Sequence, residues 1–491
     1  MNWALLGPEI ILAIFAVAVI ILDLFVKRKG TLAVLSILGL VGVIAATIPL
    51  WLSNSEIIRE ITYNPFFNGM LSVDRYALFF KVFFAGVAIL IILASTDYVH
   101  KLKGFQGEYY ALILLATLGM MFMAATRELI SIYISLELTS ISLYILAGFL
   151  KDNKSTEAGL KYMLLGSIAS AILVYGMALV FGVTGTTHLR DIWGVVQTIN
   201  GIGANPTLIM GMIFLIVGFG FKIASVPFQM WVPDVYEGAP TPITAYLSVA
   251  SKAAGFAVIL RVFFEAFGRA PWLAGQWGMI FAILSAVTMT VGNIVALSQT
   301  NIKRLLGYSS IAHAGYIMMG IAAAGVLEAK LPLARSGVLF YLVGYGLTNL
   351  GAFIAIIAIS NKTGSDMIQD FTGMARRAPL LSLALAFTLI SLTGLPPTAG
   401  FIAKIYIFNA ALQSNLLWLV IVGVLNSVIS AYYYLRIVKV MYLGEPASAE
   451  KIPSSGALRT ALIISCGGVL FIGILPNVVL KITEAVKFLI S

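Results

Sequence analysis

The stretch 218–252, GFGFKIASVPFQMWVPDVYEGAPTPITAYLSVASK, decides the fold of this chain. It places Lys222 in an apolar span, follows it with Pro227, and reaches a second apolar span with Lys252 after a predicted polar loop around Asp234. A lysine in the hydrocarbon of a bilayer costs roughly 2.5–3.5 kcal/mol on insertion scales, and a proline frees backbone groups that lipid cannot bind. Two lysines beside a broken helix therefore indicate a polar site inside a membrane protein. The alternative is that each lysine reaches the membrane surface or belongs to a satisfied pair in the core.

The composition excludes a soluble protein. Of 491 residues, 60% are hydrophobic and 11% are charged, which is more apolar surface than a soluble fold can bury. Positive loops on one side of a bilayer explain the formal net charge of +10, so no nucleic-acid partner is expected. The lone cysteine, Cys466, excludes a disulfide framework and a cysteine-ligated cluster, and the three histidines have no metal-ligand spacing. Since GxGxxG and GxxxxGK motifs are also missing, we expect no cofactor or metal on this chain.

Fourteen apolar windows are long enough to cross about 30 Å of hydrocarbon. They are 3–26, 31–53, 72–96, 108–125, 128–150, 158–182, 206–230, 241–267, 276–298, 304–326, 333–360, 378–411, 414–441 and 459–486. The predicted fold is therefore an all-α polytopic membrane protein with about 14 transmembrane helices. The first window lacks a charged n-region and a small-residue cleavage site, so we expect a retained span and not a signal peptide.

Lysine and arginine favour one set of loops. They are more frequent after odd-numbered spans, where Lys101, Lys151 and Arg376 lie, than after even-numbered spans. The positive-inside rule places the first set in the cytoplasm. We therefore expect both termini on the outer side of the inner (plasma) membrane of a prokaryotic cell, or of an equivalent energy-converting membrane.

Two interrupted spans, the seventh and the twelfth, indicate an internal repeat. The seventh span has Lys222 before its break, and the twelfth has the break SLTGLPPTAGF (391–401) before Lys404. Interrupted helices in corresponding positions are typical of inverted-repeat transporters, in which the broken helices meet near the midplane. Spans 4–8 and 9–13 are thus predicted to form two inverted five-helix repeats. The predicted parts of the chain are an N-terminal three-helix segment (1–104), the first repeat (105–270), the second repeat (271–445) and a C-terminal helix (446–491).

A buried carboxylate and three buried lysines are the main candidates for chemistry. Glu137 lies in the apolar run SIYISLELTSISLYIL (131–146) and can stay ionised beside an ammonium, so Glu137 and Lys222 are a candidate pair. Burial lowers the affinity of a lysine for its proton, and a nearby carboxylate raises it again. Glu137, Lys222, Lys252 and Lys404 would therefore form a row in which moving one charge changes the proton affinity of its neighbour. The alternative is a purely structural pair that holds two helices together.

Three further charges are less specific. Glu157 and Lys161 lie four residues apart at the start of the sixth span, where they form either a surface helix pair or a relay. Lys81, in ALFFKVFF, is predicted to extend to the membrane surface because nothing nearby offers it a partner.

His313, in SSIAHAGYIMMG, has two interpretations. It relays protons between the two halves, or it satisfies a buried hydrogen bond. Ser309, Ser310 and Tyr316 are candidates to hold water beside it.

Three segments resemble the antiporter-like membrane subunits of respiratory complex I, the proton-pumping NADH:quinone oxidoreductase. They are FKIASVPFQMWVPDVYEGAPTPITAYLSVASK (221–252), SQTNIKRLLGYSSIAHAGY (298–316) and LTGLPPTAGFIAKIYIF (392–408). The likeness is dense from about 105 to 440, and subunits of multisubunit cation/proton antiporters and membrane-bound hydrogenases share it. The opening GPEIILAIFAVAVIILDLF (7–25), the lysine at 404 and the end of the chain after a fourteenth span are most similar to the branch that lacks a long lateral helix.

The resemblance implies roles for individual residues. It assigns proton translocation to the charged residues in spans 5, 7, 8 and 12 that match charged positions of the family. It assigns secondary relay roles to polar residues that match the family's membrane axis. The first group is Glu137, Lys222, Lys252 and Lys404, and the second is Glu157, Lys161 and His313.

The resemblance also implies the function and the partners. The chain would be a proton-translocating subunit driven by quinone reduction elsewhere in the complex. Other membrane subunits, among them neighbouring antiporter-like subunits, and the lipid bilayer would surround it, and NAD, FMN, iron–sulfur clusters and quinone would be bound by partner subunits. The alternatives are a subunit of a multisubunit Na⁺/H⁺ antiporter and a non-pumping structural membrane subunit.

Overall fold

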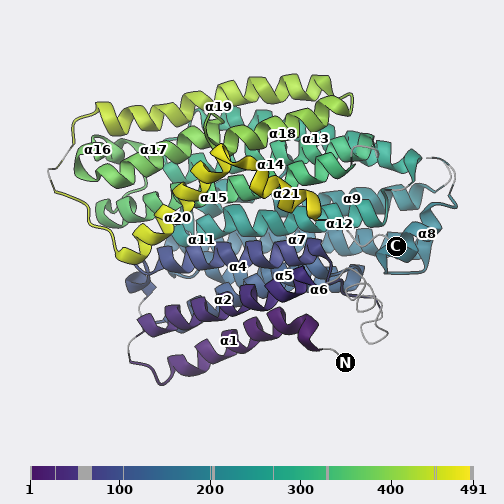
Figure 1. The fold of residues 1–491 in the computed structure, drawn as a ribbon, viewed down its shortest axis with the longest axis horizontal. Helices are drawn as coiled ribbons and strands as arrows, with labels where there is room; N and C mark the ends of the chain where they lie inside the picture. Colours follow the sequence, from purple (N-terminus) through teal and green to yellow (C-terminus); the bar gives the residue numbers. More distant parts are fainter. Residues whose placement is uncertain are drawn as a thin grey trace.

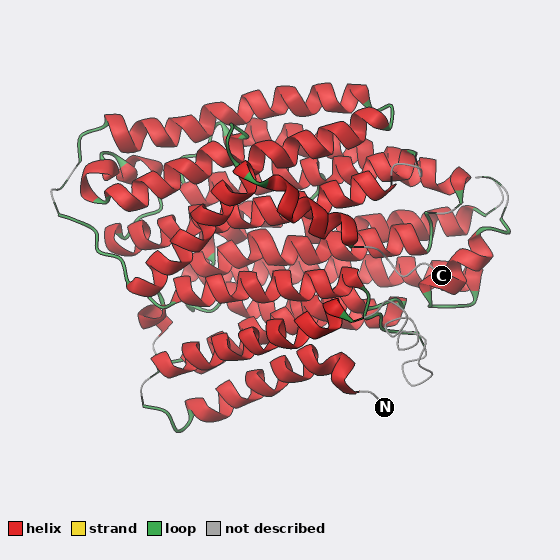
Figure 2. Ribbon diagram, viewed as in Figure 1, coloured by secondary structure: helices red, strands yellow, loops and turns green. Residues whose placement is uncertain are grey.

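The computed structural model describes residues 3–27, 29–53, 69–102, 104–199, 201, 205–268, 270–327, 331–446, 448 and 450–486. Figure 2 shows that these residues form helices and connecting loops. Three isolated antiparallel bridges join residues outside the helices or at their ends. In chain order the elements are η1 (Trp3–Leu6), α1 (Gly7–Asp23), α2 (Gly30–Leu52), α4 (Arg75–Ser95), η3 (Val99–Leu102), α5 (Gln106–Ala125), α6 (Leu129–Ala147), α7 (Asn153–Thr184), α8 (Leu189–Val196), α9 (Pro206–Ile223), α10 (Trp231–Gly238), α11 (Thr241–Tyr246), η5 (Leu247–Ser251), α12 (Lys252–Glu265), α13 (Pro271–Ala296), α14 (Ile302–Val326), α15 (Leu331–Thr363), η7 (Ile368–Phe371), α16 (Met374–Arg377), α17 (Pro379–Thr393), α18 (Ala399–Gln413), α19 (Leu417–Leu443), α20 (Gly456–Ile474) and α21 (Pro476–Ala485).

The membrane-length helices confirm the predicted all-α polytopic fold. In the described part of the chain, 13 helical segments are long and apolar enough to cross a membrane, from Ala4–Asp23 to Gly456–Ile474. Each of them overlaps one predicted window, although the fourteenth window, 459–486, extends beyond the end of α20 at Ile474 into the separate helix α21. The predicted twelfth span is divided between two shorter helices, α17 and α18. Most of the long helices run in roughly the same direction in Figure 1, as expected of a membrane bundle.

The continuous helix formed by α11, η5 and α12 lies at the centre of the bundle. This helix spans Thr241–Glu265, and every residue in its most apolar stretch of 18 residues is buried. α14 and α15 are almost as completely covered, whereas α1, α2 and α19 expose large apolar side chains such as Ile14, Leu38 and Val428. Figure 1 shows α1 at one edge of the molecule and α19 at the opposite edge. The outer helices thus present apolar faces suited to hydrocarbon or to other membrane helices, and the central helix carries Lys252.

Both predicted interruptions are present as helix ends. α9 stops at Ile223 because Ala224 adopts a left-handed conformation with φ 60°. α17 stops at Thr393, where Gly394 has φ 90°, and α18 begins five residues later. The last carbonyls of both helices are therefore free to accept hydrogen bonds from side chains inside the bundle.

The segment after the first break is a helix, so the prediction of a polar loop was wrong. α10 contains Pro233, Asp234 and Glu237. Pro233 lies in its first turn, where a helix does not use the missing N–H. Trp231 Nε1–H donates to the carbonyl oxygen of Phe221 in the last turn of α9 at 3.0 Å, which fixes the new helix against the old one. Proline and aspartate mark the start of a helix as well as a turn, and the sequence alone does not separate the two.

A π-helical turn, η5, lies directly before Lys252. Such turns shift the face on which the following side chains lie and are frequent at functional sites. The segment LSVAS has the same apolar character as its surroundings, so periodicity does not predict this turn.

Gly394→Ala should destabilise the protein by about 1–3 kcal/mol, because a left-handed residue with a Cβ is strained. The added Cβ would also lie 2.9 Å from Cδ of Lys404. Thermal unfolding of the purified protein measures the loss. Gly275→Ala is the matched control, since nothing lies within 4 Å of its Cβ and it sits inside α13. Equal stability of the two variants would contradict this account of the break.

Candidate functional site

Lys222, in the last turn of α9, is buried with 6% of its surface exposed. Its Nζ donates a hydrogen bond to the hydroxyl of Ser140 on α6 and lies 5.5 Å from the ring centroid of Tyr144. Glu137 lies one turn before Ser140 on the same helix and accepts a hydrogen bond from Ser170 Oγ on α7 at 2.5 Å. No ion pair within 4.0 Å joins Glu137 to Lys222. The structure brings the predicted pair to neighbouring positions, but the ammonium contacts Ser140 and not the carboxylate.

Lys252, the first residue of α12, has 2% of its surface exposed. Its Nζ donates to the carbonyl oxygen and to the hydroxyl of Ser310 on α14, at 2.7 and 2.5 Å. Among the described residues, no carboxylate lies within 4.0 Å of this ammonium. Neutral groups therefore hold Lys252, and they supply no compensating charge.

His313 on α14 is hydrogen-bonded to tyrosine hydroxyls at both ring nitrogens. Nδ1 lies 2.8 Å from the hydroxyl of Tyr341, and Nε2 lies 3.3 Å from that of Tyr434. Ser309 also hydrogen-bonds Tyr434. A neutral imidazole donates from one nitrogen and accepts at the other, so this environment suits the uncharged ring. The buried hydrogen bonds that the sequence allowed are present, and the relay role stays a prediction.

Lys404 on α18 lies against the broken end of α17. It has 5% of its surface exposed, and its Nζ donates to the carbonyl oxygens of Thr393 at 2.8 Å and Leu392 at 3.3 Å. The last carbonyls of a helix lack partners within the helix and carry partial negative charge. The ammonium also lies 4.9 Å from the ring centroid of Tyr316 on α14. The second break therefore creates the binding site for this lysine.

One side of α14 connects the lysines of the two predicted repeats. Ser310, His313 and Tyr316 follow one another at three-residue intervals along this helix. Ser310 contacts Lys252 at one end, and the ring of Tyr316 faces the ammonium of Lys404 at the other. Proton transfer needs donors and acceptors within hydrogen-bond reach or one water apart, and this row supplies ammonium, hydroxyl and imidazole groups in succession.

Glu157 and Lys161 lie at the exposed end of α7. Lys161 Nζ contacts Glu157 Oε1 and Asp234 Oδ2, both at 2.7 Å, with 63% of the Glu157 side chain exposed. Arg304 on α14 binds the other oxygen of Asp234 at 2.7 Å. Burial opposes ionisation of Asp234, but the hydrogen bonds from Lys161 and Arg304 hold its pKa below the usual value. This geometry is that of the surface pair, and Asp234, which the sequence did not assign to it, ties α7 to α10 and α14.

Comparison with known proteins establishes the relationship of this chain. Residues 125–430 match the family model described as NADH:quinone oxidoreductase/Mrp antiporter, TM. The NADH-quinone oxidoreductase subunit N of Dehalococcoides mccartyi is 50% identical over 487 residues, which cover 98% of this chain and 99% of that protein. The chain belongs to the NADH:quinone oxidoreductase/Mrp antiporter family. The resemblance inferred from three sequence segments is confirmed, and subunit N is the branch that it indicated.

Solved structures show the same relationship for this family member. A chain of respiratory complex I from Thermus thermophilus, with bound aureothin, is 32% identical and superposes with a TM-score of 0.78, covering 98% of this chain and 100% of that chain. A chain of the membrane-bound sulfane sulfur reductase, an archaeal respiratory membrane complex, is 26% identical with a TM-score of 0.87, covering 99% of this chain and 97% of that chain.

At Lys81, the structure of this antiporter-family chain contradicts the sequence prediction of a lysine without a partner. Its Nζ lies 2.6 Å from Oε1 of Glu9 on α1, and both side chains are buried. Glu9 is the one charged residue in the apolar run 4–22, which was the available signal. A carboxylate in one apolar span and a lysine in another form a candidate pair even when they are far apart in sequence.

A buried network of two arginines and two carboxylates was also missed. Arg261 on α12 is fully buried and binds the two oxygens of Asp74 at 2.9 and 3.0 Å and Glu265 Oε1 at 2.8 Å. Arg127 binds the other oxygen of Glu265 at 2.7 Å. The spacing of Arg261 and Glu265 in an apolar span is the signal that would have revealed it. Because a guanidinium does not release its proton, we assign this network to structure and not to the proton row.

Glu9→Gln should destabilise the protein by about 3–5 kcal/mol, because it leaves the ammonium of Lys81 buried without a counter-charge. The double variant Glu9→Leu/Lys81→Leu should recover most of that loss, since an apolar pair carries no desolvation cost. Thermal unfolding of the two variants and the parent measures the coupling. A double variant no more stable than the single one would rule out the ion pair as the cause.

Proposed function

We propose that this chain is a proton-translocating membrane subunit of a complex I-type NADH:quinone oxidoreductase, in which redox chemistry in other subunits drives proton movement through the buried lysines. The observation that carries the proposal is the row on α14, which runs from Lys252 through Ser310 and His313 toward Lys404. Relatives that align along almost the whole chain are named as subunits of this oxidoreductase.

The electrostatics of the row provide the coupling. Two unit charges about 8 Å apart interact by about 2 kcal/mol at an effective dielectric constant of about 20. At that distance, protonation or deprotonation of one lysine therefore changes the proton affinity of a neighbouring lysine by about 2 kcal/mol. Glu137, held by Ser170, supplies a negative charge at the Lys222 end of the row.

The proposed route has a direction. The face that carries Lys101 and Lys154 is cytoplasmic, protons load through the first repeat (105–270) near Lys222 and Lys252, and release occurs through the second repeat (271–445) near Lys404. The N-terminal segment (1–104) and the C-terminal helix (446–491) flank the two repeats. Both termini then face outward, as the bias of lysine and arginine implies.

The proposal assigns electron transfer to partner subunits. NAD, FMN, iron–sulfur clusters and quinone would be bound there, and this chain would hold no redox group of its own. Neighbouring antiporter-like subunits and lipid would cover the apolar faces of the outer helices, such as those of α1 and α19. A subunit of a multisubunit Na⁺/H⁺ antiporter is the second candidate, because the matching family model also describes Mrp antiporter subunits.

Lys222→Met should lower both proton translocation and quinone reduction roughly tenfold or more, because losing a positioned proton-transfer group typically costs that much. Both rates are measured in the same vesicles that contain the assembled complex, with NADH as donor. Lys451→Met, at an exposed position in the α19–α20 connection, is the control and should leave both rates unchanged.

Full retention of both rates in Lys222→Met would make Lys222 a structural lysine and favour the non-pumping subunit. Translocation of Na⁺ in exchange for protons without NADH oxidation would favour the antiporter.

A further inference from the structure

The backbone of α20 lies directly against the second helix break. A Cβ added to Gly473 would lie 2.2 Å from the carbonyl oxygen of Pro397 and 2.8 Å from Cα of Thr398, so no side chain fits there without a shift. Both neighbours are backbone atoms, which give way far less easily than the end of a flexible side chain. α20 ends at the next residue, and Pro476 begins α21. The absence of a side chain at Gly473 therefore allows α20 to contact the segment between α17 and α18.

α15 blocks the other side of α20. A Cβ added to Gly468 would lie 2.8 Å from Cδ1 of Leu347 on α15. Gly468 and Gly473 are five residues apart, which places them about 140° apart around a helix, on nearly opposite faces. Figure 1 shows α20 crossing α15, and the two helices are in contact. A retreat of α20 from the break would push it toward Leu347, so α20 is wedged between α15 and the break.

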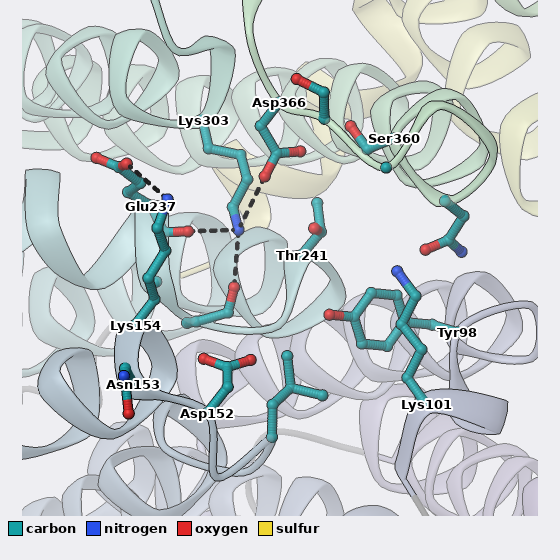
Figure 3. Close-up of a pocket in the computed structure, with 16 residues that line it drawn as sticks. Tyr98, Lys101, Asp152, Asn153, Lys154, Glu237, Thr241, Lys303, Ser360 and Asp366 are labelled. Carbon is teal, nitrogen blue, oxygen red and sulfur yellow. Dashed lines mark hydrogen bonds and ion pairs between the residues drawn. The ribbon is translucent and has the colours of Figure 1, made fainter.

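Lys404 depends on the geometry of this break. Its Nζ donates to the carbonyl oxygens of Thr393 at 2.8 Å and Leu392 at 3.3 Å, and among the described residues no carboxylate lies within 4.0 Å of it. Lys303 is different: two carbonyls at the end of α10 hold it as well, but Asp366 Oδ2 lies 3.7 Å from its Nζ (Figure 3). A full negative charge still attracts an ammonium at that distance. The ammonium of Lys404 therefore relies more on the positions of its two carbonyls.

The start of α18 links the contact at Gly473 to Lys404. Thr398 is the N-cap residue of α18, and its hydroxyl donates to the carbonyl oxygen of Leu395 at 2.6 Å, which closes the segment between the two helices. A Cβ at position 473 would have to move from 2.2 Å to at least 3.4 Å from the nearest backbone oxygen to reach ordinary contact. Because α15 blocks α20, this shift falls on the segment and on the start of α18. The hydrogen bond of Lys404 to Leu392 is already 3.3 Å long, so a shift of that size breaks it.

We infer that Gly473 is a positioning residue for Lys404. It lets α20 lie against the break, and the wedged helix fixes the start of α18, which carries Lys404, against the last carbonyls of α17. Gly473 acts through the backbone of the break and takes no part in proton transfer itself. This inference rests on the proposed function, because it assigns Gly473 to the release end of the proposed proton route.

The test is the pH dependence of proton translocation in vesicles that hold the assembled complex with Gly473→Ala, with NADH as donor. Loss of a carbonyl hydrogen bond stabilises the ammonium of Lys404 less, so the lysine loses its proton at lower pH. The alkaline limb of the rate should therefore shift to lower pH by about one unit. Tyr316 and His313 lie near this ammonium on α14, and Tyr341 of α15 hydrogen-bonds His313. All three are unchanged in the variants.

Two further variants separate positioning from packing. Gly467→Ala is the matched control, because it lies on the same helix, nothing lies within 4 Å of its Cβ, and its pH profile should be that of the wild type. Gly473→Ala/Leu347→Ala should restore the wild-type alkaline limb, since α20 then has room to retreat toward α15. A glycine with a merely structural role would lower the amount of assembled complex and leave the limb in place.

The outcomes separate the positioning role from the function on which it rests. An assembled Gly473→Ala complex with the wild-type limb would overturn the role, while loss of translocation in Lys222→Met would still support a proton-translocating subunit. If Gly473→Ala does not assemble, the double variant decides: assembly with the wild-type limb supports the role, and any other result contradicts it. Wild-type translocation at every pH in both Gly473→Ala and Lys222→Met would remove the role and the proposed function together.

Discussion

A lysine ammonium inside a bilayer needs hydrogen-bond acceptors, and the backbone carbonyls of this chain supply them. Lys404 binds the last carbonyls of the broken helix α17, Lys252 binds the carbonyl of Ser310, and Lys303 binds two carbonyls at the end of α10. The carbonyls at the ends of α17 and α10 lack partners within their helices because these helices end there, whereas Ser310 lies within α14. The helix ends thus supply acceptors for Lys404 and Lys303, and the surrounding helices separate these ends from lipid.

The type of partner divides the buried charges into two classes. Lys81 is bound by Glu9, and Arg261 is bound by Asp74 and Glu265, so loss of a proton would leave a carboxylate buried and unpaired. Lys252 and Lys404 are held by neutral dipoles, and deprotonation leaves a neutral amine among neutral groups. Only the second class can lose its proton without leaving an unpaired charge buried in the bundle. This difference favours Lys252 and Lys404 as proton carriers and the first class as structural pairs.

The sequence predicts the spans, the two breaks and the family because each has a local signature. Apolar length identifies the spans, and glycine and proline beside Lys222 and Lys404 identify the breaks. The sequence does not predict which buried side chains pair with each other. Lys81 and Glu9 are far apart in sequence, and their ion pair forms only when α1 packs on α4. The hydrogen bond of Lys222 to Ser140 in place of Glu137 is likewise decided by how two helices rotate against each other. Side-chain partners across a bundle depend on tertiary packing, which periodicity does not encode.

Lys252 is where the first repeat meets α14, so its removal tests the account most directly. The measurement is the number of protons translocated per NADH oxidised by the reconstituted complex with Lys252→Met, with quinone reduction recorded in the same vesicles. The account predicts that proton translocation is lost and that coupled quinone reduction falls with it, while the complex stays assembled. Wild-type proton translocation and quinone reduction in that variant would contradict a row of lysines that carries protons through this subunit.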